Sequence, residues 1–104
     1  MTEIRYEIEL LSVGEESFSL EELAEIAGLH PSMVEKFVEF GVIEPVKVFE
    51  SGARFDLNSL KRLGMAFRLR YHLGVNLAGA SIIIDLVEKL TALQRENKKL
   101  RNQL

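Results

Sequence analysis

The last 29 residues constrain the fold of this 104-residue chain more than any other segment. Between Asn76 and Leu104 there is no proline, so the pattern predicts one continuous helix that begins after an Asn76 cap. At about 1.5 Å per residue this helix would be roughly 40 Å long, too long for so small a domain to cover. Its core positions, which we call the heptad stripe, alternate at spacings of four and three residues: Ile83, Leu86, Leu90, Leu93, Asn97, Leu100 and Leu104.

The heptad stripe needs a partner, because a helix that projects alone would expose its leucines to water. We expect self-association into a homodimer through a coiled coil. The alternative is a helix that folds back onto its own domain. Asn97 would select the register and the dimeric state, or would be an exposed residue of a frayed helix end. The pattern leaves open whether two such helices pair parallel or antiparallel.

Local signals in the first half of the chain predict a helix-turn-helix. Ser19 and Glu22 form a capping box that starts a first helix, at about Leu20–Ala27. Gly28 follows where a left-handed residue would end that helix. Pro31 suits the first turn of a second helix, because its missing N–H would have no partner there. The connection between the helices is short, so they must cross compactly.

A hairpin wing and a third helix are predicted next. Residues 46–49 and 54–55 are expected to be short strands around a turn. Asp56 would cap the third helix, whose core-facing residues are predicted to be Leu57, Leu60, Leu63, Phe67 and Tyr71. Residues 4–10 alternate between apolar and charged side chains, which predicts a strand that joins the wing within the chain or is exchanged between subunits.

These elements define the expected fold class and domain organisation. The chain is predicted to be mainly α-helical, with a winged helix-turn-helix, a short β wing and a long C-terminal coiled-coil dimerisation helix. Residues 1–75 would form the N-terminal strand and winged domain, and residues 76–104 the dimerisation helix.

Composition excludes several classes of function. Cysteine is absent, which rules out a disulfide framework and a thiolate metal site. His30 and His72 lie on different predicted elements, so we expect no metal site. Without a nucleophile motif, a phosphate-binding glycine loop or a nucleotide fingerprint, we expect neither an enzyme nor a cofactor. No apolar run is long enough to span a membrane and no signal-peptide layout is present, so we expect a cytoplasmic protein.

Charge is distributed unevenly along the chain. Residues 1–52 carry twelve glutamates against three basic residues, a net charge of −9, whereas residues 53–104 have a net charge of +6. Within residues 19–45, six glutamates accompany a single lysine, a net charge of −5. Such asymmetry bears on the choice of partners rather than on the fold.

Several motifs resemble the MerR superfamily. They are Phe18-Ser19-Leu20-Glu21-Glu22-Leu23-Ala24, Gly28-Leu29-His30-Pro31 and Phe40-Gly41-Val42-Ile43-Glu44-Pro45. Gly74-Val75-Asn76-Leu77-Ala78-Gly79, taken with His30-Pro31, resembles the HspR heat-shock repressors. The same segments, with Arg68-Leu69-Arg70 and Leu93-Gln94-Arg95-Glu96-Asn97, resemble the CbpM chaperone-modulator family. The resemblance covers about residues 18–104.

One function that the resemblance implies is a DNA-binding transcriptional regulator of heat-shock genes, of the MerR or HspR type. A helix that reads DNA needs cationic or neutral side chains against the phosphates. DNA-binding members begin their second helix with Thr-Leu-Arg-Tyr, whereas this chain has Met33-Val34-Glu35-Lys36, with Glu35 in place of the arginine. Docking would bring several carboxylates within a Debye length of the phosphates. These charges argue against nucleic acid as the partner.

The CbpM resemblance implies a chaperone modulator that binds the J-domain of a CbpA-type, DnaJ-like co-chaperone and inhibits its activity. J-domains present a positively charged helix, which an acidic helix-turn-helix would complement. The predicted partner-binding residues are five glutamates and two apolar anchors: Glu21, Glu22, Glu25, Glu35, Glu39, Met33 and Phe40. Glu21 and Glu22 are also explained without a partner, because carboxylates stabilise a helix N-terminus.

The third helix carries a basic group that would be the best remaining support for nucleic acid: Lys61, Arg62, Arg68 and Arg70. These side chains do not share one face of the helix. We favour ion pairs with the acidic half of the chain or with a second subunit as their explanation.

Overall fold

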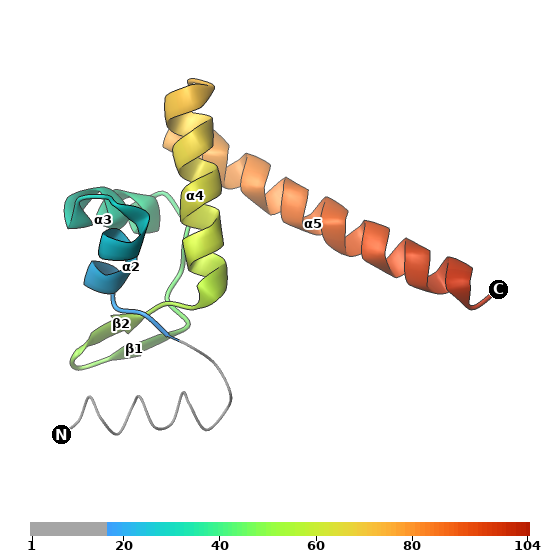
Figure 1. The fold of residues 1–104 in the computed structure, drawn as a ribbon, viewed down its shortest axis with the longest axis horizontal. Coiled ribbons are helices and arrows are strands. Elements are labelled where there is room, and N and C mark those ends of the chain that lie inside the picture. The colour runs from blue at the N-terminus through green and yellow to red at the C-terminus, as the bar shows by residue number, and fades with distance from the viewer. Residues whose placement is uncertain (1–16) are drawn as a thin grey trace.

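Helices α2 (Leu20–Ala27) and α3 (Pro31–Glu39) form the predicted helix-turn-helix at the start of the described part of the chain, residues 17–104 of this computed structural model. In Figure 1 the two helices lie side by side, next to the middle and lower turns of α4. The strand predicted at residues 4–10 lies outside the described residues.

The bounds of α2 agree with the prediction because the signals that set them are local. The Ser19 hydroxyl accepts a hydrogen bond from the Glu22 backbone N–H at 3.0 Å, and the Glu22 carboxylate accepts one from the Ser19 N–H at 3.1 Å. At the other end Gly28 has φ +70°, the left-handed conformation that glycine adopts without steric cost.

Helix α3 begins with Pro31 in its first turn and is capped by His30. The His30 Nδ1 atom accepts a hydrogen bond from the Ser32 backbone N–H at 3.1 Å. His30 therefore satisfies one of the free N–H groups at the helix start. On this helix the side chains of Val34 and Phe37 are fully buried.

The wing is an antiparallel hairpin of β1 (Lys47–Phe49) and β2 (Gly52–Arg54), with Lys47 opposite Arg54. Phe55 lies beyond β2 and pairs with Phe18 through two backbone hydrogen bonds of 2.8 Å. This bridge holds the segment before α2 against the wing. The prediction of a hairpin here is confirmed, with strand ends shifted by one or two residues.

Helix α4 (Leu57–His72) forms where it was predicted and is capped by Asp56, but its buried face matches the prediction only in part: Leu63 is fully buried and Leu60 packs against the core. The prediction that Leu57 and Tyr71 face the core is wrong, because these side chains are 59% and 50% exposed. The buried residues of α4 are partly polar: Ser59, Arg62, Leu63 and Ala66. Arg62 can be buried because α5 and a backbone carbonyl supply its hydrogen-bond partners.

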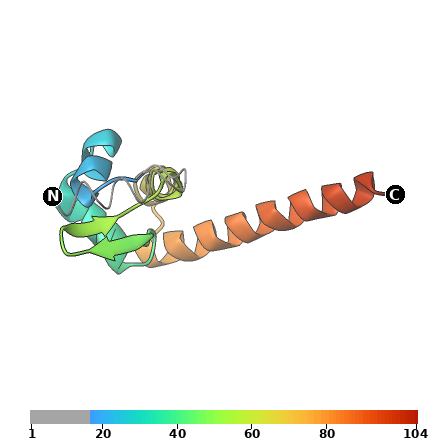
Figure 2. The ribbon, with the colours of Figure 1, turned by 90° about the horizontal axis from the view of Figure 1, so that it is seen from below.

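Helix α5 (Leu77–Asn102) is the single continuous helix that the sequence predicts, capped by Asn76 through a 2.7 Å hydrogen bond to the Gly79 N–H. Its first turns pack against the domain, where Ala80 and Ile84 are fully buried. Beyond them α5 leaves the domain, and Figure 2 shows its second half extending away from the wing and the helix-turn-helix.

One core joins the described helices. Leu23 of α2, Val34 and Phe37 of α3, Leu63 of α4 and Ile84 of α5 are all fully buried in it. Burying such side chains is the main source of stability in a domain of this size. The core therefore fixes the helix-turn-helix relative to the base of α5.

Candidate partner-binding surfaces

The predicted interface glutamates lie on the outer faces of the helix-turn-helix. Glu21 and Glu25 are exposed on α2, and Glu35 and Glu39 are exposed on α3. Glu35 and Glu39 are four residues apart and so share one face of their helix. These four carboxylates take part in no ion pair among residues 17–104 and face water in the single chain.

Glu22 differs from the other four because its carboxylate already has partners within the chain. Its Oε1 atom accepts the Ser19 N–H and lies 3.5 Å from the Arg54 Nη1 atom. Arg54 in turn donates to the Ser17 carbonyl at 3.0 Å. The interpretation of Glu22 as a capping residue is therefore confirmed, and its proposed contact with a partner remains a prediction.

A groove of about 710 Å³ lies between α3, the end of α4 and the start of α5. It brings together three of the predicted partner-binding residues, Met33, Glu39 and Phe40. Met33 is half-buried and Phe40 is 46% exposed. Glu21, Glu22, Glu25 and Glu35 do not line this groove.

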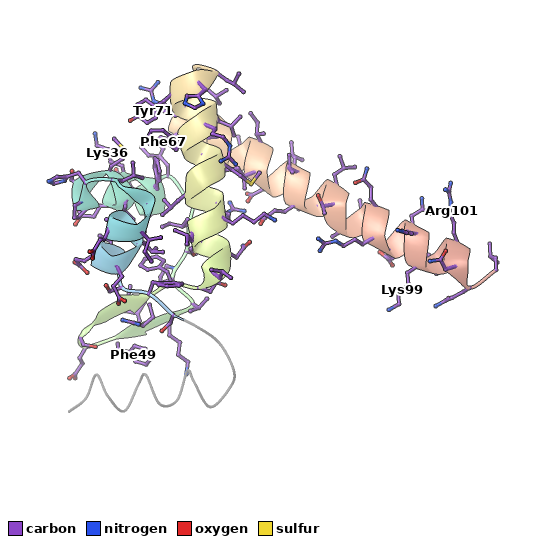
Figure 3. All side chains as sticks on the ribbon, viewed as in Figure 1. Lys36, Phe49, Phe67, Tyr71, Lys99 and Arg101 are labelled. Carbon is purple, nitrogen blue, oxygen red and sulfur yellow. The ribbon has the colours of Figure 1, made fainter. Side chains whose placement is uncertain are left out.

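Residues that the sequence did not assign to the surface complete the groove. Lys36, Arg70, Tyr71 and Leu77 line it together with the three predicted residues. The Tyr71 hydroxyl donates a 3.7 Å hydrogen bond to the Met33 sulfur, which links the α4 wall to the α3 wall. Figure 3 shows Lys36 on α3 and Tyr71 near the end of α4 at the same end of the domain. Tyr71 was missed because its spacing matches the apolar positions of α4.

Arg62 connects the helix-turn-helix to the base of α5. Its side chain is 11% exposed; it donates to the Val42 carbonyl just after α3, to Asp85 Oδ1 at 2.8 Å and to Glu88 Oε1. The expectation that Arg62 pairs with the acidic half of the chain or with a second subunit is wrong, because its carboxylate partners lie on α5 of the same chain. The other members of the basic group are exposed and make no ion pair within the described chain: Lys61, Arg68 and Arg70.

The heptad stripe lies on the open side of α5. Leu86, Leu90, Leu93 and Leu100 are each more than half exposed, and Asn97 is exposed between them. Ile83, at the base, is half-buried against the domain. Ile82 is 61% exposed and lies four residues before Leu86, so it extends the same apolar face. Ile82 lies outside the spacing of four and three residues that defines the heptad stripe.

The described residues meet neither the requirements of a metal site nor those of a membrane-spanning helix. Across residues 17–104, the histidine, aspartate and glutamate side chains form no cluster of three that could hold a metal ion. The helices described here also lack the combination of length and apolar composition that crossing a membrane requires.

Curated proteins that are similar to this chain include a chaperone modulator and a heat shock protein. The chaperone modulatory protein CbpM of Escherichia coli O1:K1 is 27% identical over 88 residues, which cover 85% of this chain and 87% of that protein. The putative heat shock protein HspR of Streptomyces coelicolor is 29% identical over 77 residues, which cover 74% of this chain and 51% of that protein.

A solved structure supports the fold. The crystal structure of a MerR-family transcriptional regulator from Bacillus cereus superimposes with a TM-score of 0.55 over 85% of this chain and 71% of that chain, at 17% sequence identity. The family model described as MerR HTH family regulatory protein matches residues 18–102, from the segment before α2 to the last residue of α5. The chain therefore belongs to the MerR helix-turn-helix family of regulatory proteins.

Proposed function

We propose that this protein is a cytoplasmic chaperone modulator that binds the J-domain of a CbpA-type, DnaJ-like co-chaperone and inhibits its activity. The similarity to CbpM spans most of both chains. The mechanism is competitive occlusion: the bound modulator covers the J-domain surface that would engage its chaperone, with no chemical change in either protein.

The observation that carries this proposal is the exposed acidic face of α3, the helix that a DNA-binding member would place in the major groove. Glu35 and Glu39 are exposed there, and Lys36 is the only cation of the helix. Phosphates would be repelled by this face, whereas a positively charged J-domain helix would be attracted to it. Glu21 and Glu25 on α2 add to the same negative field.

Residues 1–75 are proposed as the partner-binding domain and residues 76–104 as the dimerisation helix. The exposed leucines of α5 support this division, because a monomer would leave a continuous apolar stripe in water. A homodimer would carry two J-domain sites, one on each winged domain.

The similarity to HspR favours a second candidate, a DNA-binding regulator of heat-shock genes. Titration of the full chain against the purified J-domain and against promoter DNA, at moderate salt, separates the two. We expect binding to the J-domain and no specific DNA complex. Submicromolar DNA binding without J-domain affinity would overturn the proposal.

A charge-reversed variant tests the surface. Glu35→Lys/Glu39→Lys should weaken J-domain binding by about tenfold or more, because like charges would then meet across the interface. Glu44→Lys/Glu50→Lys is the matched control, since it makes the same change of net charge at two exposed positions outside α2 and α3. Unchanged affinity in the double variant, with circular dichroism showing a folded chain, would remove these two residues from the interface.

A further inference from the structure

The groove between α3, α4 and α5 differs in charge from the acidic surface around it. Among its lining residues, Lys36 and Arg70 are cations and Glu39 is the only carboxylate. We propose that this groove receives an apolar side chain of the J-domain together with a neighbouring carboxylate of the same J-domain segment, and that Lys36 and Arg70 bind that carboxylate. This inference rests on the proposed function and names the contact that orients the partner.

The apolar part of the groove has the form of a pocket for an anchor residue. Phe37 is fully buried at its base, while Met33, Phe40, Tyr71 and Leu77 line the part open to solvent. The hydrogen bond from Tyr71 to Met33 joins its two walls before any partner arrives. Burial of an apolar side chain between aromatic and thioether groups is the usual source of strong interface contacts.

The two cations are available to a partner. Neither Lys36 nor Arg70 makes an ion pair among residues 17–104. The Arg70 guanidinium carbon lies 5.7 Å from the centre of the Tyr71 ring, which holds its charge beside the apolar wall. A carboxylate next to the anchor would therefore meet two cations at the rim of the groove.

This arrangement fixes the direction in which the partner lies. Basic groups of the J-domain are attracted broadly to α2 and α3, and this attraction alone does not select one alignment. A carboxylate is repelled by that surface except at the groove. A J-domain segment with an apolar anchor and an adjacent carboxylate can therefore bind in one register only. Specificity then comes from the repulsion that the carboxylate meets in other registers.

Adding negative charge in the groove should weaken J-domain binding, whereas general electrostatics predicts that it strengthens this binding. Arg70→Glu makes the protein more acidic, so the long-range attraction to a basic J-domain should increase. If Arg70 binds a carboxylate, the same substitution should instead weaken J-domain affinity by about tenfold or more, and Lys36→Glu should do likewise. Arg68→Glu is the matched control, because Arg68 is exposed on the same helix, carries the same charge and does not line the groove.

Calorimetric titration of full-length variants with the purified J-domain tests this. Weaker binding by Arg70→Glu, with unchanged or tighter binding by Arg68→Glu, supports the inference, and one carboxylate-to-lysine variant of the J-domain should restore affinity for Arg70→Glu. Equal effects of the two arginine variants, or no such restoration across the exposed J-domain carboxylates, would overturn the inference and leave the proposed function standing. No binding by the unmodified chain would overturn both.

Discussion

At the scale of single residues, Arg62 shows how a buried charge shapes this domain. A guanidinium removed from water is costly unless its donors find acceptors, and here the Val42 carbonyl, Asp85 and Glu88 supply them. The two carboxylates are 57% and 39% exposed, so solvent screens their attraction to Arg62. The structural value of Arg62 therefore lies mainly in the hydrogen bond to Val42 and in its packing.

Replacing Arg62 by methionine tests this interpretation. Arg62→Met keeps much of the aliphatic volume but leaves the Val42 carbonyl without its donor, so we expect the free energy of unfolding to fall by about 1–3 kcal/mol. Lys61→Met, on the exposed face of the same helix, should change it by less than about 0.5 kcal/mol. Urea denaturation followed by circular dichroism measures both. Equal stability of the two variants would contradict a structural role for Arg62.

At the scale of elements, α2 depends on the hydrogen bonds at its ends. It has eight residues, a length at which an isolated helix is marginal in water. The capping box satisfies N–H groups that would otherwise lack partners at its first turn. Glu22 also contacts Arg54 of the wing, so this cap joins the helix-turn-helix to the hairpin.

Loss of the cap should destabilise the domain without altering its surface charge. Ser19→Ala should lower the free energy of unfolding by about 1 kcal/mol, because the Glu22 N–H loses its acceptor. Ser51→Ala, in the exposed hairpin turn, serves as the control and should have an effect of less than about 0.5 kcal/mol. Thermal unfolding of the two variants in parallel gives the difference, and an unchanged Ser19→Ala midpoint would show that the cap is dispensable.

The elements also show what could be predicted from the sequence. The ends of α2 and the cap of α5 depend on residues within three or four positions, so local patterns predict them well. The buried face of α4 depends on Asp85 and Glu88, more than twenty residues away, which allow an arginine to be buried. Apolar spacing alone therefore assigned Tyr71 to the core.

The candidate partner-binding site could likewise be predicted only in part, because local patterns do not give contacts between distant residues. Charge and helix position were enough to propose Glu35, Glu39 and Phe40, all of which are exposed. The groove, however, requires α3 to lie beside the end of α4, and no local pattern gives that arrangement. The assignment of Arg70 to the site therefore depends on the tertiary structure.

At the scale of the whole molecule, the exposed heptad stripe is expected to form the dimer interface. Leu93→Lys places a charge in the middle of the stripe, so it should convert the dimer to a monomer in sedimentation analysis. Ala92→Lys adds the same charge at the adjacent exposed position outside the stripe and should leave the dimer intact. A dimer that survives Leu93→Lys would have to be held by another surface.

The uneven charge of the chain bears on how two copies pair. Lys98, Lys99 and Arg101 lie near the tip of α5, where Figure 3 labels two of them, while the acidic helix-turn-helix lies at its base. Parallel pairing would bring two basic tips together and two acidic domains together. Antiparallel pairing would place each basic tip toward the acidic domain of the other subunit, so we expect the antiparallel arrangement.

Spin labels on single cysteines can measure this orientation, because the natural chain contains no cysteine. If the stripe pairs along its whole length, Gln103→Cys labels in an antiparallel dimer should lie roughly 30 Å apart, given a rise of about 1.5 Å per residue. In a parallel dimer the same labels should approach the interaxial spacing of about 10 Å. Gln94→Cys, near the middle of the stripe, should give a short distance in both cases and so confirms that a dimer is present. A short distance between the two Gln103 labels would exclude the antiparallel arrangement. It would mean that packing of the paired leucines outweighs the repulsion between the basic tips.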